Sequence, residues 1–177
     1  MVDRPVHIIQ LACSSDNGAC DMYVRPLKPI ESNAHEKTGM WWDGQRLSRH
    51  NQVLKTSSLG RSLHTFLDII ESQEYPAVLV GHNIRAYDNE VLLDAAGRLG
   101  LRQNFVDAIY GDIDTLTLFR KERTGLGKGG YNQQSLVKEY LNYTYDKYDA
   151  DENVDALKDL VESEICTHVL GKYIHQW

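Results

Sequence analysis

A short apolar run, Ala77–Val80, ends in a glycine, and the polar pair His82-Asn83 separates it from an amphipathic segment headed by Asp88. Apolar residues bounded by a glycine are typical of a short buried strand. Further apolar residues follow at helical spacing from 86 to 99. A strand, a polar turn and a helix in this order predict an α/β sheet. Asp88 is then expected just past the end of a strand, where such sheets bind ligands.

The rest of the chain predicts one α/β or α+β domain spanning residues 1–177. Two strand-like stretches, 7–14 and 20–25, are joined by a turn at 15–18 and favour a β-hairpin. Asp112 and Asp114 are placed where they could cap a helix that runs through Leu118. We also expect a strand at 105–110, an irregular segment at 41–57, and helices at 31–37, 58–72, 132–141, 150–161 and 164–174.

Composition and charge narrow the class of function. The net charge of −6 argues against tight coating of nucleic acid, but not against an enzyme that grips a few nucleotides. The three cysteines, Cys13, Cys20 and Cys166, form neither a zinc motif nor a pairing framework, which indicates a reducing compartment. The sequence has no signal peptide and no membrane-spanning run. We therefore expect an intracellular protein, cytoplasmic or nuclear, without a membrane partner.

Four weaker features have ordinary explanations beside functional ones. The glycine-rich loop 125–130 lacks the GxxxxGK[ST] spacing of a phosphate-binding loop and predicts a flexible linker. Lys128 in that loop belongs to a local basic cluster, which either meets a phosphate backbone or forms a solvated face. The pair Trp41-Trp42 either stacks on bases or covers the edge of the core. His168 and His175 lack a third metal ligand.

Several segments, in the right order and over nearly the whole chain, resemble the DEDDh 3′-to-5′ exonucleases. The stretch from His82-Asn83 to Asp88 is similar to the family's second motif, H-N-x-x-x-x-D. Ala34 with Thr38-Gly39-Met40 resembles the motif A-x-x-x-(H/T)-G-(I/L/M), and 114–116 resembles D-(T/S)-L. Within the family, the chain looks most like the three-prime repair exonucleases and the exonuclease-like domain of promyelocytic leukaemia protein.

The resemblance implies an RNase H-like fold, a mixed sheet flanked by helices, and a two-metal phosphodiesterase. In the family, four carboxylates hold two Mg²⁺ ions and a histidine deprotonates the attacking water. Clustered carboxylates are needed because two divalent ions repel each other at close range. Carried over by position, Asp88 is the metal ligand, and Thr38, His82 and Asn83 are expected to bind DNA or RNA. Lys128 is added to the expected substrate-binding residues from the basic cluster, not from a motif of the family.

The departures from the family concern the catalytic residues. The first motif, D-x-E on the central strand, should precede residue 7 and is not found in Met1–Val6, so we expect the sheet to lack that strand. The third motif, H-x-A-x-x-D-V-x-A-L, aligns with 148–157, where Tyr148 stands for the histidine and Asn153 for the metal-binding aspartate. Asparagine is a poor Mg²⁺ anchor. Tyrosine, with an ordinary pKa of about 10, is a poor general base.

Three hypotheses follow. In the first, the chain is a catalytically incomplete exonuclease-like domain that binds a single strand or its 3′ end weakly, or binds a protein. In the second, it is a fragment of an active Mg²⁺-dependent enzyme whose D-x-E strand lies outside this sequence. In the third, a partner strand, from another protein or a second copy, completes the sheet beside 7–14 and 77–80, whose edges are otherwise unpaired or pair with each other.

Overall fold

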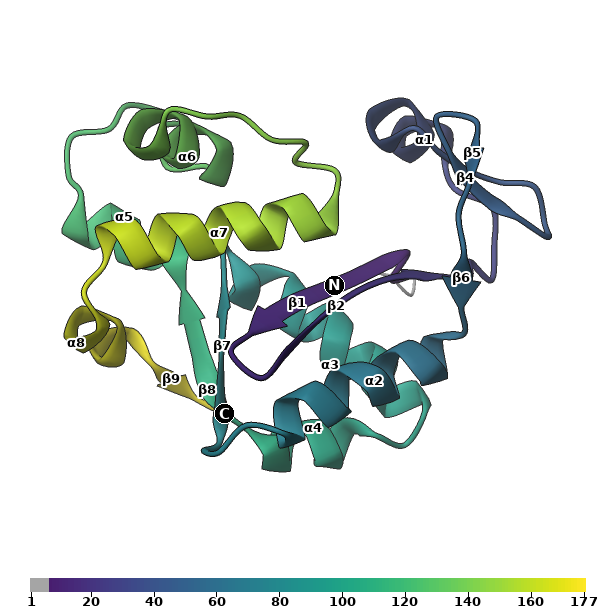
Figure 1. Cartoon of the computed structure of the whole chain (residues 1–177), viewed down its shortest axis with the longest axis horizontal. Helices are drawn as coiled ribbons and strands as arrows, with labels where there is room; N and C mark the ends of the chain where they lie inside the picture. Colours follow the sequence, from purple (N-terminus) through teal and green to yellow (C-terminus); the bar gives the residue numbers. More distant parts are fainter. Residues whose placement is uncertain (1–6) are drawn as a thin grey trace.

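The computed structural model describes residues 7–177 and has a mixed α/β architecture, with 47% helix and 21% strand. Its strands form three small sheets, with orders β1-β2-β6, β3-β4-β5 and β7-β8-β9 (Figure 1). The stretch 1–6, where the first exonuclease motif was sought, lies outside the described residues. The strands are β1 (Gln10–Ser15), β2 (Gly18–Val24), β3 (Met40–Trp42), β4 (Leu47–Arg49), β5 (Gln52–Val53), β6 (Thr56–Ser57), β7 (Ala77–Gly81), β8 (Ile109–Asp114) and β9 (His175–Gln176).

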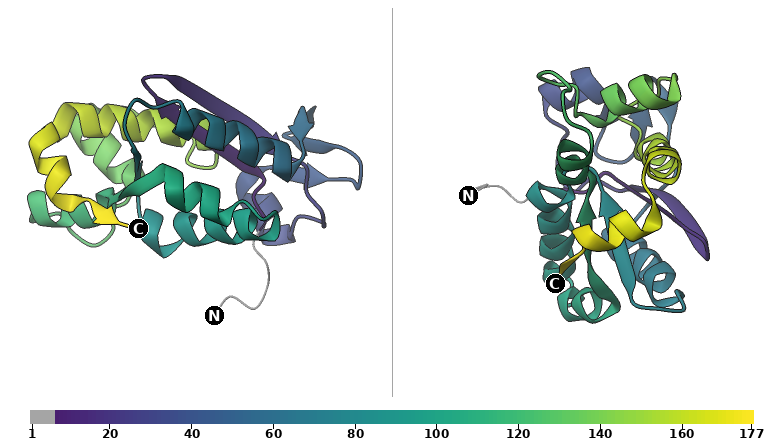
Figure 2. Two further views of the ribbon diagram at one scale, coloured as in Figure 1. Left: turned by 90° about the horizontal axis from the view of Figure 1, so that it is seen from below. Right: turned by 90° about the vertical axis from the view of Figure 1, so that its left-hand side faces the viewer.

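The predicted hairpin is present. Strands β1 and β2 are antiparallel, with Ser15 opposite Gly18 across a two-residue turn, and β6 joins β2 in parallel. The hairpin lies between two helices, because β2 contacts α2 and β1 contacts α7, as the right-hand view of Figure 2 shows. The helices are α1 (Ser32–Thr38), α2 (Leu59–Glu71), α3 (Asp88–Arg98), α4 (Arg102–Ala108), α5 (Thr115–Glu122), α6 (Gln133–Leu141), α7 (Ala150–Glu164) and α8 (Thr167–Leu170).

The sheet β7-β8-β9 is built on two parallel strands. β7 pairs in parallel with β8, and the short β9 runs antiparallel to β8. Within residues 7–177, β1 pairs only with β2 and β7 pairs only with β8, so these two strands do not pair with each other. In Figure 1 the hairpin runs across the view, whereas β7 and β8 run up it. Within the described residues, β1 and β7 therefore each have one unpaired edge.

Two hydrophobic clusters hold the elements together, and β8 contributes to both. Ile109, near the start of β8, belongs to the cluster made by the hairpin and helices α2, α3 and α4. Ile113, near its end, belongs to the cluster made with α5, α6 and α7. Phe105 and Phe119 are the largest side chains buried in the first and the second cluster, respectively. The parallel sheet thus joins the two packed halves.

Several sequence predictions need correction. The segment expected as a strand at 105–110 is mostly helix α4, because Phe105 packs inward as part of a helical turn, and β8 begins only at Ile109. The stretch 41–57 is not irregular, since it contains most of β3 and all of β4, β5 and β6. The last expected helix is broken into α8, a 3₁₀ turn (Gly171–Tyr173) and β9. Among the described residues, no helix is both long and apolar enough to cross a membrane.

Candidate functional site

The Gly81-His82-Asn83 turn links the ends of the two parallel strands. A side chain at Gly81 would put its Cβ 2.7 Å from the Cβ of Ile84, which is buried, so only glycine fits there. Asn83 adopts a left-handed conformation with φ of 63°, which asparagine tolerates well. Its backbone N–H donates to Oδ1 of Asp114, at 3.0 Å. Asp114 also accepts the N–H of Leu116 and so caps α5, as the sequence predicted.

Asp88 begins α3 close to this turn. It is solvent-accessible, but protein atoms crowd its carboxyl group, and this partial desolvation raises its pKa above the ordinary value. A hydrogen bond from its own backbone N–H opposes the shift, and the negative charge of Asp114 adds to it. A raised pKa means that the folded state binds the proton more tightly than the unfolded state does. The charged carboxylate therefore costs stability at neutral pH, and this cost disappears as the pH falls through the folded-state pKa.

The variant Asp114→Asn is expected to lower the pKa of Asp88 toward its ordinary value. Asparagine still accepts the two backbone N–H groups that Asp114 accepts, so the change removes the charge and keeps the cap. The measurement is an NMR titration of the Asp88 side-chain carboxyl carbon. Asp94→Asn, an exposed change on the same helix, is the control and should leave the Asp88 titration where it was. An unchanged Asp88 pKa in Asp114→Asn would contradict the interaction.

His82 points into the protein, away from the position expected of a substrate-binding residue. Its Nδ1 lies 3.0 Å from the hydroxyl of the buried Thr115, which itself donates to the carbonyl of Gly81. Nδ1–H therefore donates to Thr115. Burial lowers the pKa of His82, while the backbone of Tyr131 and the charge of Asp114 act in the opposite direction. The imidazole is thus a neutral group that fastens the turn to α5.

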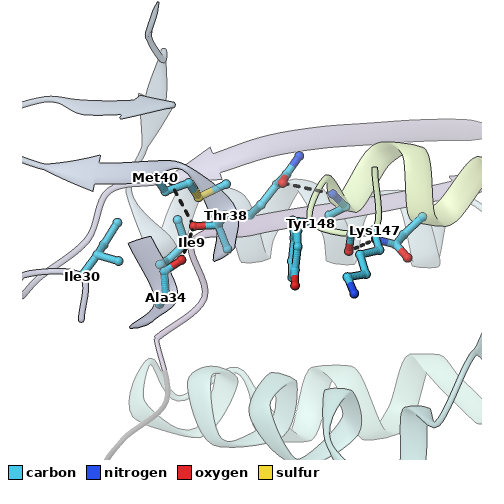
Figure 3. A pocket seen from close by; sticks show the side chains of 10 residues that line it. Ile9, Ile30, Ala34, Thr38, Met40, Lys147 and Tyr148 are labelled. Carbon is cyan, nitrogen blue, oxygen red and sulfur yellow. Dashed lines mark hydrogen bonds between the residues drawn. The ribbon is translucent and has the colours of Figure 1, made fainter. Parts of the chain in front are cut away.

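A pocket of about 240 Å³ lies between the hairpin, helix α1 with the residues on either side of it, and the start of α7. Figure 3 shows Tyr148 and Lys147 on one side of it and Ala34, Thr38 and Ile9 on the other. Three predicted site residues from distant segments, Thr38, Tyr148 and Asn153, are brought together here. The lining consists of Ile9, Gln10, Ile30, Ala34, Thr38, Met40, Lys147, Tyr148, Ala150 and Asn153.

Thr38 has a structural role in the pocket, whereas the side chain of Tyr148 has none among the described residues. The Thr38 hydroxyl donates to the Ala34 carbonyl and accepts the N–H of Met40, which closes the end of α1. The Tyr148 side chain stays available, because the residue is 37% exposed and only its backbone N–H is bound, to Asp146. The Lys147 ammonium lies 5.0 Å from the centre of the Tyr148 ring, a cation–π distance.

Asn153 acts as a hydrogen-bond donor. Its side-chain amide donates to the carbonyl of Lys147 at 2.6 Å and to that of Asp149 at 2.9 Å. These bonds fold the segment before α7 back onto the first turn of the helix. A deprotonated carboxylate cannot donate to either carbonyl. The amide therefore has a structural function at a position that aligns with a metal ligand of the exonucleases that the sequence resembles.

The variant Asn153→Asp introduces the aspartate that the resembled exonucleases have at the aligned position. It is expected to lower the free energy of unfolding by about 1–2 kcal/mol at neutral pH. The reason is that the carbonyls of Lys147 and Asp149 lose their donor and face a negative charge. Urea unfolding measures this change. Asn153→Ala is the matched control, since it removes the donor without adding charge and should cost less. If Asn153→Asp is as stable as the wild type, the amide is not needed at this position.

Sequence reasoning missed Arg49, which lies on β4 and binds the end of α1 and the segment 146–149. Its guanidinium binds the carboxylates of Asp149 and Asp146, and its Nε donates to the carbonyl of Thr38 at 3.2 Å. Gln10 adds a bond from β1 to Asp149 at 3.1 Å. Burial opposes charge on Asp149, but the bonds from Gln10, Arg49 and the Asp151 backbone outweigh it and lower the pKa of Asp149. An arginine in a segment expected to be irregular gave no signal of this role.

The remaining candidates lie apart from the pocket. Lys128 is exposed in the loop before α6, and Asp88, His82 and Asn83 do not line the pocket. Trp41 is 52% exposed and borders a second, open depression with His35 and His50. Across residues 7–177, no group of three or more His, Cys, Asp and Glu side chains is arranged to hold a metal ion. Comparison of the sequence with models of protein families and with curated proteins finds no match.

Proposed function

We propose that the chain has the RNase H-like fold of the DEDDh exonucleases and binds the 3′ end of a single nucleic acid strand without cutting it. The observation that carries this proposal is the pocket that gathers Thr38, Tyr148 and Asn153. These positions belong to two of the motifs that resemble the family, and the chain between them is more than one hundred residues long. Their convergence on one concave surface is what a shared ligand site requires.

The order of the elements supports the proposed fold. A hairpin is followed by helix α1, which ends at Thr38, and by strands β3 to β6. Helix α2, strand β7, the His82-Asn83 turn and helices α3 and α4 come next. Strand β8 with Asp114 and the helices α5 to α7 complete the order. In an RNase H-like sheet a central strand would lie between β1 and β7. The unpaired edges of these two strands agree with that arrangement.

The chemistry of the pocket suits the end of a nucleic acid strand. Ile9, Ile30, Ala34 and Met40 supply apolar walls against which a base can pack. The accessible Tyr148 ring offers a stacking surface on the face opposite Lys147, and the Lys147 ammonium, which lies over the ring, offers one positive charge for a phosphate. Stacking is tolerant of base identity and contributes about 1–3 kcal/mol per base. The net charge of −6 limits the electrostatic contribution, so we expect weak binding, to DNA or RNA.

The residues present do not fit the two Mg²⁺ ions of the family. The pair of ions needs several carboxylates, and Asn153 presents an amide whose hydrogens are already donated. Asp114 is occupied by two backbone N–H groups, which leaves Asp88 as the accessible carboxylate near the turn. Tyr148, in place of the histidine, is not suited to deprotonate water at neutral pH. We therefore derive no metal-dependent step for this chain.

The variant Tyr148→Ala is expected to weaken binding of a single strand about tenfold or more, because one base loses its stacking partner. The measurement is fluorescence anisotropy at low salt with an oligonucleotide labelled at its 5′ end, so that the 3′ end stays free. Tyr75→Ala is the matched control, since Tyr75 is 75% exposed in the loop before β7 and outside the pocket. A circular single strand should bind less well than the linear one.

Two outcomes would overturn the proposal. If no strand binds at low salt, the chain has no nucleic acid function. If Mg²⁺ or Mn²⁺ leads to shortening of the strand and Asp88→Ala abolishes it, the chain is an active enzyme. That result would favour the alternative, a fragment of a metal-dependent 3′-to-5′ exonuclease.

A second candidate function, protein interaction, is favoured by the unpaired edges of β1 and β7. Open strand edges present unpaired backbone groups that bind an additional strand. In this proposal, an extended segment of a partner, or of a second copy of the chain, completes the sheet. Light scattering over a range of concentrations tests the second-copy form, and a monomer at every concentration would leave only a different protein as partner.

A further inference from the structure

Cys13 and Cys20 face each other across the β1–β2 hairpin. They are directly opposed in the register, and their Sγ atoms lie 3.1 Å apart, within reach of a thiol–thiol hydrogen bond. Opposed residues of antiparallel strands have Cα atoms about 4.5–5.5 Å apart, which falls inside the range of about 4.4–6.8 Å that disulfides span. No sequence motif predicts this pairing, because the spacing between the cysteines fits no known framework.

The two thiols have different surroundings. Cys20 is 9% exposed and belongs to the core cluster beneath α2, whereas Cys13 is only partly buried and packs at the edge of that cluster. The hydrogen bond with Cys20 lowers the pKa of Cys13, although burial opposes the shift. The same bond, together with burial, raises the pKa of Cys20. The more accessible sulfur is therefore also the one that loses its proton first, as an attacking thiolate must.

We propose that Cys13 and Cys20 are a reversible modification site, a dithiol that low-molecular-weight disulfides such as glutathione disulfide oxidise to a cross-strand disulfide. The Cys13 thiolate attacks one sulfur of the small disulfide, forms a mixed disulfide and releases one thiolate. Cys20 then gives its proton to solvent, and its sulfur attacks Cys13 Sγ and displaces the second thiolate. In sum, two protein thiols and one small disulfide give one protein disulfide and two small thiols.

The position of the pair gives oxidation a defined consequence. The bond would fix β1 to β2 in their present register and would remove both thiols from the edge of the core. The loop that it closes is short, so its effect on the stability of the whole chain is small. The same strand β1 carries Gln10, which lines the pocket and binds Asp149.

The test uses the full chain with Cys166→Ser, which removes the exposed third thiol. The protein is equilibrated with glutathione disulfide, its free thiols are blocked with N-ethylmaleimide, and its intact mass is measured. We expect a species that has lost two hydrogen atoms, carries no glutathione and takes up no N-ethylmaleimide, and that dithiothreitol converts back to the dithiol. With Cys20→Ser added, a stable glutathione adduct should form on Cys13 instead.

A matched control moves the second thiol to the other face of the strand. In Cys20→Ser with Ala19→Cys, the new cysteine neighbours the old position but is exposed, and it should not form a disulfide with Cys13. The proposal is overturned if Cys166→Ser keeps both thiols under conditions that add glutathione to Cys166 in the wild type. It is also overturned if the chain stops at a glutathione adduct on Cys13 while Cys20 is present.

Discussion

The variant Asp112→Ala is expected to lower the free energy of unfolding by about 3 kcal/mol, because a buried carboxylate with several partners is lost. Asp112 is 1% exposed in the middle of β8, and its carboxylate binds the guanidinium of Arg85. It also accepts the Asn89 amide at 3.0 Å and the Trp177 indole N–H at 2.8 Å. Removal of the carboxylate leaves three donors without their acceptor. Arg85, at 34% side-chain exposure, recovers some hydration, which limits the loss.

Urea unfolding, followed by Trp fluorescence and circular dichroism, measures this loss. A decrease of about 3 kcal/mol corresponds to roughly 6–12 °C in Tm for a chain of this size. Asp112→Asn keeps one acceptor oxygen and should cost about half as much. Asp94→Ala is the surface control, because its pair with Arg98 is 56% exposed on the Asp94 side and should contribute less than about 1 kcal/mol. Equal losses in Asp112→Ala and Asp94→Ala would refute the buried role of Asp112.

Loss of Asp112 should also release the segment that follows α8. Arg85 donates to the Tyr173 carbonyl as well as to Asp112, and Trp177 reaches Asp112 directly. β9 adds two residue pairs to β8, too few to hold the segment alone. We therefore expect faster amide exchange at 171–177 in Asp112→Ala than in Asp94→Ala.

The variant Arg49→Ala is expected to cost about 2–4 kcal/mol and to abolish binding at the pocket. The Arg49 side chain is 11% exposed and the Asp149 side chain 17%, so the pair is mostly removed from solvent. Without the arginine, Asp149 and Asp146 keep their negative charges side by side with no cation to neutralise them. The bond to the Thr38 carbonyl is lost too, and it ties one wall of the pocket to β4.

The pH dependence of stability separates this role from simple packing. The lowered pKa of Asp149 means that its charged form stabilises the folded state above the ordinary pKa of aspartate, and that this contribution is lost as the pH falls through the folded-state pKa. Arg49→Ala should weaken this acid-side loss. Arg46→Ala is the control, since Arg46 makes an exposed pair with Asp43 in the neighbouring turn. An acid profile identical in wild type and Arg49→Ala would contradict the proposed network.

Local sequence patterns predicted most elements whose signals lie within one segment. The helical spacing in 58–72 is confirmed by α2, which buries Leu63, Phe66, Leu67 and Ile70 and is capped by Ser58. The hairpin turn is confirmed as well, because its two-residue connection fixes the register on both sides. Asp114 caps α5, but Asp112 does not, since it lies inside β8 and binds Arg85. Both residues are aspartates near the end of an apolar stretch, so the local pattern does not distinguish the helix cap Asp114 from the buried strand residue Asp112.

The hydrogen bonds around the pocket could not be predicted from the motifs. The motif resemblance singled out Thr38, Tyr148 and Asn153, yet it could not reveal that Asn153 donates to two carbonyls or that Arg49 joins the walls. The Arg49 bonds reach a segment up to 100 positions away in the chain, so no local pattern encodes them. The Asn153 bonds span only four and six positions, but they depend on how the segment before α7 is folded. The same holds for the opposed sulfurs of Cys13 and Cys20, which depend on the strand register.

The sequence alone predicts the mixed α/β class, the hairpin and the main helices. It also predicts the strand, turn and helix that carry Asp88. Those features depend on the spacing of apolar residues and on turn and cap chemistry within a few positions. The tertiary structure decided which polar groups are already occupied by structural hydrogen bonds and which remain accessible. A side chain that fills a motif position can bind a ligand only if its hydrogen-bonding groups are free, and that depends on partners brought close by folding.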